Sequence, residues 1–263
     1  MRDHALTGVA QVPAVPVQVG PLATCSDPTC GLFAADARRF HADSVPPTGL
    51  RRWSGSTAMM LDLALYPSAD TYVKAVSKRS RGNVPRAAKK AARLGITCAR
   101  INPDGHVASL AAIRGSKRFR SGGPVLAAWF GGRAPGEDTC VAPEAPACPD
   151  HWTLVWGAFL ETSGGPRLIA YLALRRVGDL CRTFDLMAHG DHLGTGVMKL
   201  LFLEVARWLL ERQDREAQGV RWLMYGAMEH GAPGLHEWKR LLCFTPAHLL
   251  FEDVPAAPPS RAA

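Results

Sequence analysis

The residues best suited to binding an anion lie in the run Ala188-His-Gly-Asp-His-Leu-Gly-Thr-Gly-Val197. Gly194, Thr195 and Gly196 come just before an apolar segment with helical periodicity, so they predict a glycine loop that opens a helix. Free backbone N–H groups and the positive end of the helix dipole there favour a phosphate or another oxyanion. Gly196→Val should then abolish donor binding and leave the fold largely intact. The alternative is that the glycines serve only a sharp turn.

A second feature suited to anions is a strongly basic stretch of the chain. Residues 74–133 contain 14 Lys and Arg and one acidic residue, within a chain of net charge +8. Solubility does not require such a lack of acids, whereas a polyanion or a phosphorylated ligand would be attracted to it. A solvated helix face is the alternative. The cations that we predict to contact phosphates are Lys78, Arg79, Arg81, Arg86, Lys89 and Lys90.

Hydrophobic periodicity and breaker residues predict the elements that position these groups. An apolar strand at 57–65 precedes a helix capped by Ser68. After a break, Asn83 caps a second helix that ends at Gly95, so the basic residues lie on a helix, a break and a helix. The remaining expected elements are a strand at 96–101, a helix at 106–119, three antiparallel strands at 153–161, 168–176 and 180–188, a long amphipathic helix at 193–217, a strand at 220–225, a helix at 234–242 and a strand at 244–251.

This order, with a glycine loop between a strand and a long helix, resembles the GNAT acyltransferase superfamily. The acyl-CoA pyrophosphate loop of that superfamily reads Gln/Arg-x-x-Gly-x-Gly/Ala. The corresponding stretch here is Asp191-His-Leu-Gly194-Thr-Gly196, in which an acid replaces the usual cation or amide. Because a carboxylate repels a pyrophosphate, Asp191 argues against acyl-CoA as the donor.

Two further stretches are similar to the Fem-type branch, which takes an aminoacyl group from aminoacyl-tRNA. Residues 72–95 resemble its basic segment, with a helix, an Ala-Lys-Lys run and a closing Gly. Residues 235–246 resemble its closing element, in which Lys239 follows an aromatic residue and Cys243 stands where a Gly is expected. The resemblance covers about residues 57–251. It implies an α/β, GNAT-like fold with a mixed, mostly antiparallel central sheet flanked by helices, and it adds Lys239 to the phosphate-binding residues.

The resemblance also implies that the acyl group lies in a gap between the strand before the glycine loop and the strand after the long helix. Acyl transfer to an amine needs a base, donors for the tetrahedral oxyanion and a proton for the leaving group. Tyr225, at the end of the second strand, is the predicted acid or oxyanion donor, unless it is only a buried core residue. Glu229 and the neighbouring His230 are candidate bases. His189 and His192 flank the loop and could exchange a proton near neutral pH.

The cysteines indicate no disulfide framework. There are seven, and their odd number in a chain without a secretion signal favours reduced thiols. No two cysteines have the two-residue spacing of a zinc knuckle, and we predict no metal site. Two alternatives stay open, ligation by Cys25 and Cys30, or ligation by Cys181, Asp185, His189 and His192.

Composition sets the class of the protein. With 47% hydrophobic and 21% charged residues, the chain is neither wholly disordered nor collagen-like. It has no Gly-x-Ser-x-Gly elbow and no Walker loop, which disfavours a Ser nucleophile and a P-loop NTPase. We expect an irregular N-terminal arm at 1–50 with a strand near 15–19, an acyltransferase domain at 51–253 and a disordered tail at 254–263.

The predicted function is transfer of an aminoacyl or acyl group to an amine on a small molecule or peptide. Aminoacyl-tRNA is the favoured donor, with tRNA as the partner and no obligatory cofactor. One alternative is an N-acetyltransferase that uses acyl-CoA, and another is a non-catalytic GNAT-like protein that binds nucleic acid. Because no apolar run could span a membrane and no secretory leader is present, we expect a cytoplasmic protein.

Overall fold

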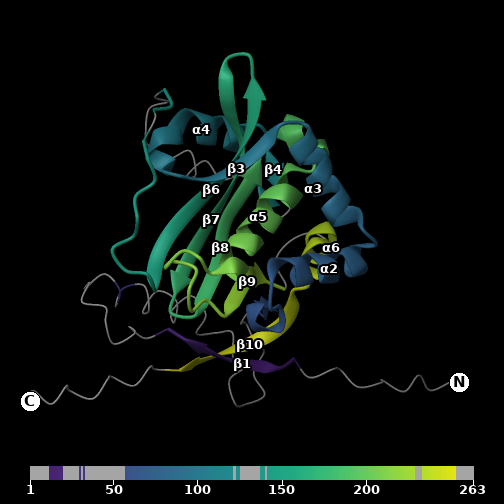
Figure 1. The fold of residues 1–263 in the computed structure, drawn as a ribbon, viewed down its shortest axis with the longest axis vertical. Coiled ribbons are helices and arrows are strands. Elements are labelled where there is room, and N and C mark those ends of the chain that lie inside the picture. The colour runs from purple at the N-terminus through teal and green to yellow at the C-terminus, as the bar shows by residue number, and fades with distance from the viewer. Residues whose placement is uncertain are drawn as a thin grey trace, which may run out of the picture.

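The structure is a computed structural model that describes residues 12–19, 30, 32, 57–120, 123–124, 137–139, 141–228 and 233–252. Its centre is an eight-stranded sheet in the order β1-β10-β2-β9-β8-β7-β6-β3 (Figure 1). The strands of this sheet are β1 (Ala14–Gln18), β2 (Ala58–Asp62), β3 (Ile96–Ile101), β6 (His151–Thr162), β7 (Gly165–Val177), β8 (Leu180–Ala188), β9 (Trp222–Ala227) and β10 (Thr245–Glu252). The short strands β4 (Phe119–Arg120) and β5 (Gly123–Pro124) pair with each other.

Helices cover both faces of the sheet. They are α2 (Ala69–Ser80), α3 (Asn83–Arg93), α4 (Val107–Gly115), α5 (Val197–Glu211) and α6 (Pro233–Leu241). Helices α2, α3, α5 and α6 lie on one face, where the largest apolar core forms, and α4 packs on the other (Figure 1). Only β1–β10 and β8–β9 pair in parallel among the described strands, so the predicted mixed, mostly antiparallel sheet is confirmed.

Local signals set the ends of α2 and α3. Ser68 and Thr71 form a capping box at the start of α2, as the sequence predicts. The predicted cap of α3 is wrong: Asn83 is already its first residue, and Gly82 occupies the N-cap with φ +77°. The Asn83 amide oxygen accepts instead from Arg86 Nη2 at 2.7 Å. Gly95 follows α3 with φ +79°, the left-handed conformation expected for it.

Helix α5 is shorter than its periodicity suggests. A 3-10 turn at Gly190–Thr195 precedes it, and Arg212, with φ +52°, ends it. Trp208 Nε1 then donates to the Asp214 carboxylate at 2.7 Å in the following turn. Helix α5 is buried on nearly all sides because it lies between the sheet and the pair α2–α3.

The sheet is interrupted between β8 and β9. These strands pair in parallel at three positions only, from Leu180↔Trp222 to Arg182↔Met224. Beyond Arg182 no further pair forms between them, so the gap implied by the resemblance is present. Among the described residues, no helix is both long and apolar enough to cross a membrane.

The N-terminal strand is held at the far edge of the sheet. The predicted strand near residues 15–19 is confirmed as β1, which pairs in parallel with β10. Gln18 also exchanges two hydrogen bonds with Asp179 in the β7–β8 turn. The division into an arm at 1–50, a domain at 51–253 and a tail at 254–263 stays a prediction, because most of the arm and the whole tail lie outside the described residues.

Candidate active site

A cavity of about 710 Å³ lies where β8 and β9 separate. Thr183 Oγ1 donates to the Met224 carbonyl at 3.3 Å, just where the pairing of the two strands ends. The start of α5 and one side of α6 complete the wall, with Met198 and Trp238. The charged residues that line the cavity are Lys117, Arg182, Asp185 and Lys239. Three of these four are cations and most of the other lining residues are apolar, so the cavity is apolar with a net positive charge.

Tyr225 lines this cavity, as predicted. It is 7% exposed, and its ring packs edge-on against Phe244 at 5.7 Å and near Phe202 at 6.0 Å, between ring centroids. Lys239 Nζ lies 5.6 Å from the centroid of the same ring. The aromatic cluster fixes the ring beside Gly226, but β9 continues to Ala227, so the expectation that Tyr225 is the last residue of its strand is wrong. Tyr225 does lie in the gap between β8 and β9, and its catalytic role stays a prediction.

Lys239 does not lie on the exposed basic surface with the other predicted phosphate ligands. Its side chain is 1% exposed, and Nζ donates to the Ala227 carbonyl oxygen at 2.5 Å. Lys239 lies on α6, and its aliphatic stem is buried on the inner side of that helix. Its ammonium faces the Tyr225 ring and the cavity wall. Lys239 thus supplies positive charge to the cavity.

The glycine loop packs on α3. Gly196 has φ +91°, and a Cβ there would lie 2.4 Å from the Ala87 carbonyl oxygen, whereas a Cβ on Gly194 would meet no atom within 4 Å. The expectation that Gly196→Val leaves the fold largely intact is therefore wrong. Thr195 Oγ1 donates to the His192 carbonyl at 2.6 Å and accepts from Val197 N at 3.3 Å, so this hydroxyl serves the loop itself.

The predicted histidines lie in the loop at the edge of the cavity. His189 Nδ1 accepts from Asp191 N at 3.3 Å, and the rings of His189 and His192 are 5.8 Å apart. Burial, and then the neighbouring His189, lower the pKa of His192, which favours the neutral imidazole that can accept a proton. Leu193, not either histidine, is the residue of this loop that lines the cavity. Glu229 and His230 lie outside the described residues.

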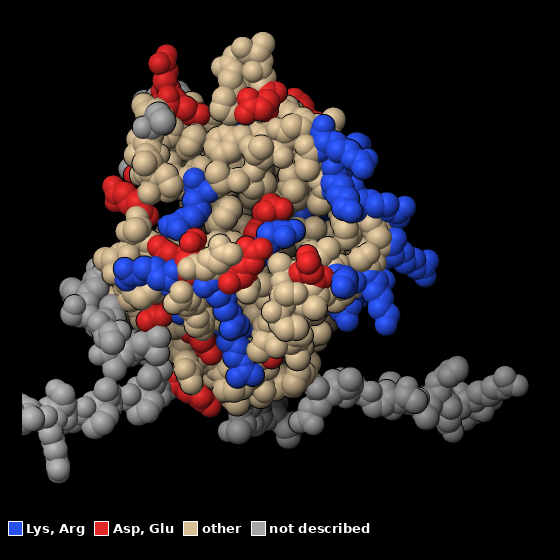
Figure 2. All heavy atoms as spheres, viewed as in Figure 1, with Lys and Arg blue, Asp and Glu red and all other residues tan. Residues whose placement is uncertain are grey.

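The predicted basic residues form one surface. Figure 2 shows Lys and Arg gathered along the edge of the molecule formed by α2 and α3. We define the basic surface as the exposed residues Lys78, Arg79, Arg81, Arg86, Lys89 and Lys90. None of these six forms an ion pair with a described Asp or Glu. Their positive charge is therefore available to a ligand.

Two contacts connect the basic surface to the borders of the cavity. Lys90 Nζ donates to the Gly194 carbonyl oxygen at 3.5 Å, which links α3 to the glycine loop. Arg79 Nη1 donates to the Arg240 carbonyl oxygen at 3.4 Å, which links α2 to α6. A ligand on the basic surface would therefore lie next to both elements that border the cavity.

A polar network in the cavity wall was not predicted. Asp185 Oδ2 accepts from Tyr171 Oη at 2.8 Å and from Arg114 Nη2 at 3.3 Å. Burial, and then the charge of Asp185, raise the pKa of Tyr171, so its hydroxyl stays protonated and donates. The three residues come from β8, β7 and α4, and no sequence spacing connects them. Among the described residues, Cys181, Asp185, His189 and His192 do not form the metal site left open above.

Solved structures match this fold, whereas no protein-family model and no curated protein sequence matches the chain. FemX has a TM-score of 0.50 and 10% identity, over 84% of this chain and 66% of FemX. The tandem GNAT protein from the clavulanic acid biosynthesis pathway has a TM-score of 0.43 and 16% identity, over 90% of this chain and 59% of that protein. L-PGS from Bacillus licheniformis has a TM-score of 0.40 and 14% identity, over 65% of this chain and 45% of that protein.

The chain thus spans less than two thirds of the length of each of these three structures. The likeness to FemX concerns the fold as a whole, the mixed sheet flanked by helices. The chain has a GNAT-like fold.

Proposed function

We propose that the protein transfers an aminoacyl or acyl group from a phosphate-rich donor to an amine, with the reaction in the cavity between β8 and β9. The observation that carries the proposal is the adjacency of the cavity, the glycine loop and the basic surface. Leu193 belongs to both the loop and the cavity wall. Lys90, on the basic surface, contacts the loop at Gly194.

Aminoacyl-tRNA is the donor class that these features favour. The basic surface extends over α2 and α3, and an RNA stem offers a row of phosphates over a comparable length. The Asp191 side chain is 86% exposed in the glycine loop, where it would repel a pyrophosphate. This exposed carboxylate disfavours acyl-CoA as the donor.

The cavity contains groups for each step of acyl transfer to an amine. The amine nitrogen attacks the ester carbonyl carbon, a C–N bond forms, and the carbonyl oxygen becomes an oxyanion. The Tyr225 hydroxyl donates to that oxyanion, and the Lys239 ammonium beside the ring adds positive potential. The C–O bond to the carrier then breaks, the carrier oxygen takes a proton, and the amine loses one. Asp185 in the cavity wall is placed to accept it, and neutral His192, in the loop beside Leu193, is the alternative.

The donor is identified by titrating the full chain separately with tRNA and with coenzyme A at several salt concentrations. We expect tRNA to bind, and its affinity to fall steeply with salt because bound counterions are released. Lys89→Ala/Lys90→Ala should make the slope of log K against log[salt] smaller by about 2. The control Arg207→Ala/Arg215→Ala removes two exposed cations outside the basic surface and should leave the slope unchanged.

Each other outcome selects a different function. Binding of coenzyme A without tRNA would overturn the donor and favour acyl-CoA-dependent N-acetylation. Binding of tRNA without acyl transfer from aminoacyl-tRNA to any of a panel of amines would favour the non-catalytic nucleic-acid-binding protein. Equal salt slopes for both double variants would leave the basic surface as a solvated face.

A further inference from the structure

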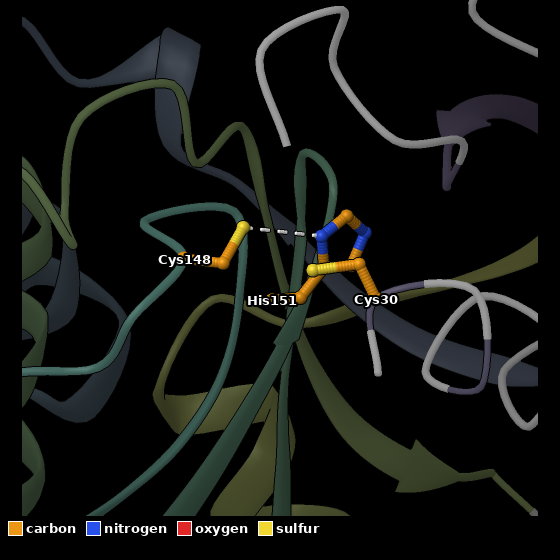
Figure 3. Close-up of side chains that lie close together, drawn as sticks. All are labelled: Cys30, Cys148 and His151. Atoms are coloured by element: carbon orange, nitrogen blue, oxygen red, sulfur yellow. Dashed lines mark hydrogen bonds between the residues drawn. The ribbon is translucent and has the colours of Figure 1, made fainter. Parts of the chain in front are cut away.

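A second group of reactive side chains lies at the end of the meander away from the cavity. Cys30, Cys148 and His151 are all buried, and their possible ligand atoms lie within 4.8 Å of one another. Figure 3 shows the two sulfur atoms and the imidazole ring facing each other, although they come from an N-terminal segment, a loop and the start of β6. No part of the acyl-transfer site involves this group.

The distance between two of the ligand atoms agrees with tetrahedral zinc. Cys148 Sγ lies 3.5 Å from His151 Nδ1. Two ligands with Zn–S of about 2.3 Å and Zn–N of about 2.1 Å at a tetrahedral angle would be about 3.6 Å apart. The residue types agree as well, since thiolate and imidazole together are typical of structural zinc.

The turn that carries two of these residues is held rigid. The Pro149 carbonyl accepts from Trp152 Nε1 at 2.8 Å and from Arg176 Nη1 at 2.7 Å. The Asp150 carboxylate pairs with Arg176 Nη2 at 2.7 Å, and the Asp150 carbonyl accepts from Gly178 N at 2.9 Å. Cys148 and His151 are thus oriented by their surroundings, as the ligands of a protein metal site need to be.

The charges also balance in a buried environment. Two thiolates neutralise Zn²⁺ and the imidazole binds as a neutral ligand, so a Cys₂His site adds no net charge to the interior. The nearby Arg176 guanidinium is compensated by the Asp150 carboxylate, so the pair adds no net charge beside the site.

We propose that Cys30, Cys148 and His151 bind a zinc ion that fixes the N-terminal segment to the open end of the β6–β7 hairpin, where His151 pairs with Val177. The N-terminal segment is also attached to the sheet nearby, where Gln18 hydrogen-bonds to Asp179 in the β7–β8 turn. A tetrahedral zinc takes a fourth ligand besides these three side chains. The ion holds Cys30 to a sheet that is otherwise built from residues after 57 and from β1.

The full chain, purified with a reductant and without chelator, should contain about one zinc per molecule by elemental analysis. Replacement by Co²⁺ should give thiolate-to-cobalt charge-transfer absorption. Cys148→Ser and His151→Gln should each weaken zinc binding at least tenfold in a competition titration. Cys98→Ser, which removes a half-buried thiol on β3 outside the group, should bind zinc as the unaltered chain does.

Metal binding by the unaltered chain tests the proposal even if a variant fails to fold. A folded chain that binds neither Zn²⁺ nor Co²⁺ would overturn the proposal. A Cys30–Cys148 disulfide found by mass spectrometry in protein handled without reductant or chelator would also overturn it. Cys30→Ser supplies a further variant, because Cys30 lies outside the sheet, and it should lose zinc while the sheet stays folded.

Discussion

At the β7–β8 turn, Arg176 is 1% exposed and its guanidinium donates to three backbone carbonyls and to Asp150. Elsewhere in the molecule, cations lie on the exposed basic surface or line the cavity, as Lys117 does. The first cation has its hydrogen bonds satisfied inside the protein and joins three segments of chain. The others keep their charge available to a ligand. The difference separates a charge that builds the fold from charges that serve binding.

The largest expected effect is on stability, at Arg176. Arg176→Met should lower the free energy of unfolding by about 3–5 kcal/mol, because Asp150 and the carbonyls would lose their buried partner. Lys89→Met, which removes an exposed cation, should change it by less than about 0.5 kcal/mol. Urea unfolding followed by circular dichroism measures both. Similar losses in the two variants would remove the distinction between the two regions.

The next effect is on activity and should leave stability unchanged. Tyr225→Phe keeps the ring in its aromatic cluster and removes the hydroxyl, so turnover should fall by about 10²–10³-fold. Donor affinity and Tm should stay close to those of the unaltered chain. The matched control is Tyr66→Phe, which removes a hydroxyl outside the cavity. Full turnover in Tyr225→Phe would make this residue part of the core, and a collapse in Tm would show that its hydroxyl satisfies a buried group.

The two glycines of the loop should respond differently to alanine. Gly196→Ala places a methyl group against the Ala87 carbonyl at a positive φ, and it should destabilise the protein by about 1–3 kcal/mol. Gly194→Ala meets open space and should change stability by less than about 0.5 kcal/mol. Thermal unfolding of the pair measures this difference. A loss of donor affinity in stable Gly194→Ala would show that the loop itself binds the anion.

Features encoded by neighbouring residues were predictable. The strand at 96–101 lies where periodicity puts it, and Ser68 and Gly95 mark the ends expected for them. The resemblance, rather than periodicity, supplied the gap beside β9 and with it the place of Tyr225.

Features that depend on distant segments were not predictable. Lys239 looked like a surface cation, yet α6 buries it against Ala227. The contact of Gly196 with Ala87 depends on how α3 packs, which no local period encodes. The Cys-x-x-His spacing at 148–151 was a usable signal, but its meaning depends on Cys30, which is 118 residues away in the chain.

The smallest expected effect concerns a carboxyl where the N-terminal strand meets the sheet. Burial raises the pKa of Asp179 from 3.8 to about 6, even though its Oδ1 accepts from Gln18 N at 2.9 Å. The folded state therefore holds this proton more tightly than the unfolded state between about pH 4 and 6, so stability from this group falls as the pH rises through that window. Above it, the buried charge remains a small destabilising contribution.

Asp179→Asn removes that charge, and an Asn amide oxygen can still accept from Gln18 N. The variant should melt about 2 °C higher than the unaltered chain at pH 7, and the two Tm values should converge as the pH falls to about 4. Thermal unfolding at pH 4, 5, 6 and 7 measures both curves. Asp70→Asn is the control, because Asp70 is exposed at the start of α2, and its curve should show no such convergence. A constant difference between Asp179→Asn and the unaltered chain at every pH would mean that the proton on Asp179 is not involved, and that Gln18 and its strand are held by the hydrogen bonds alone.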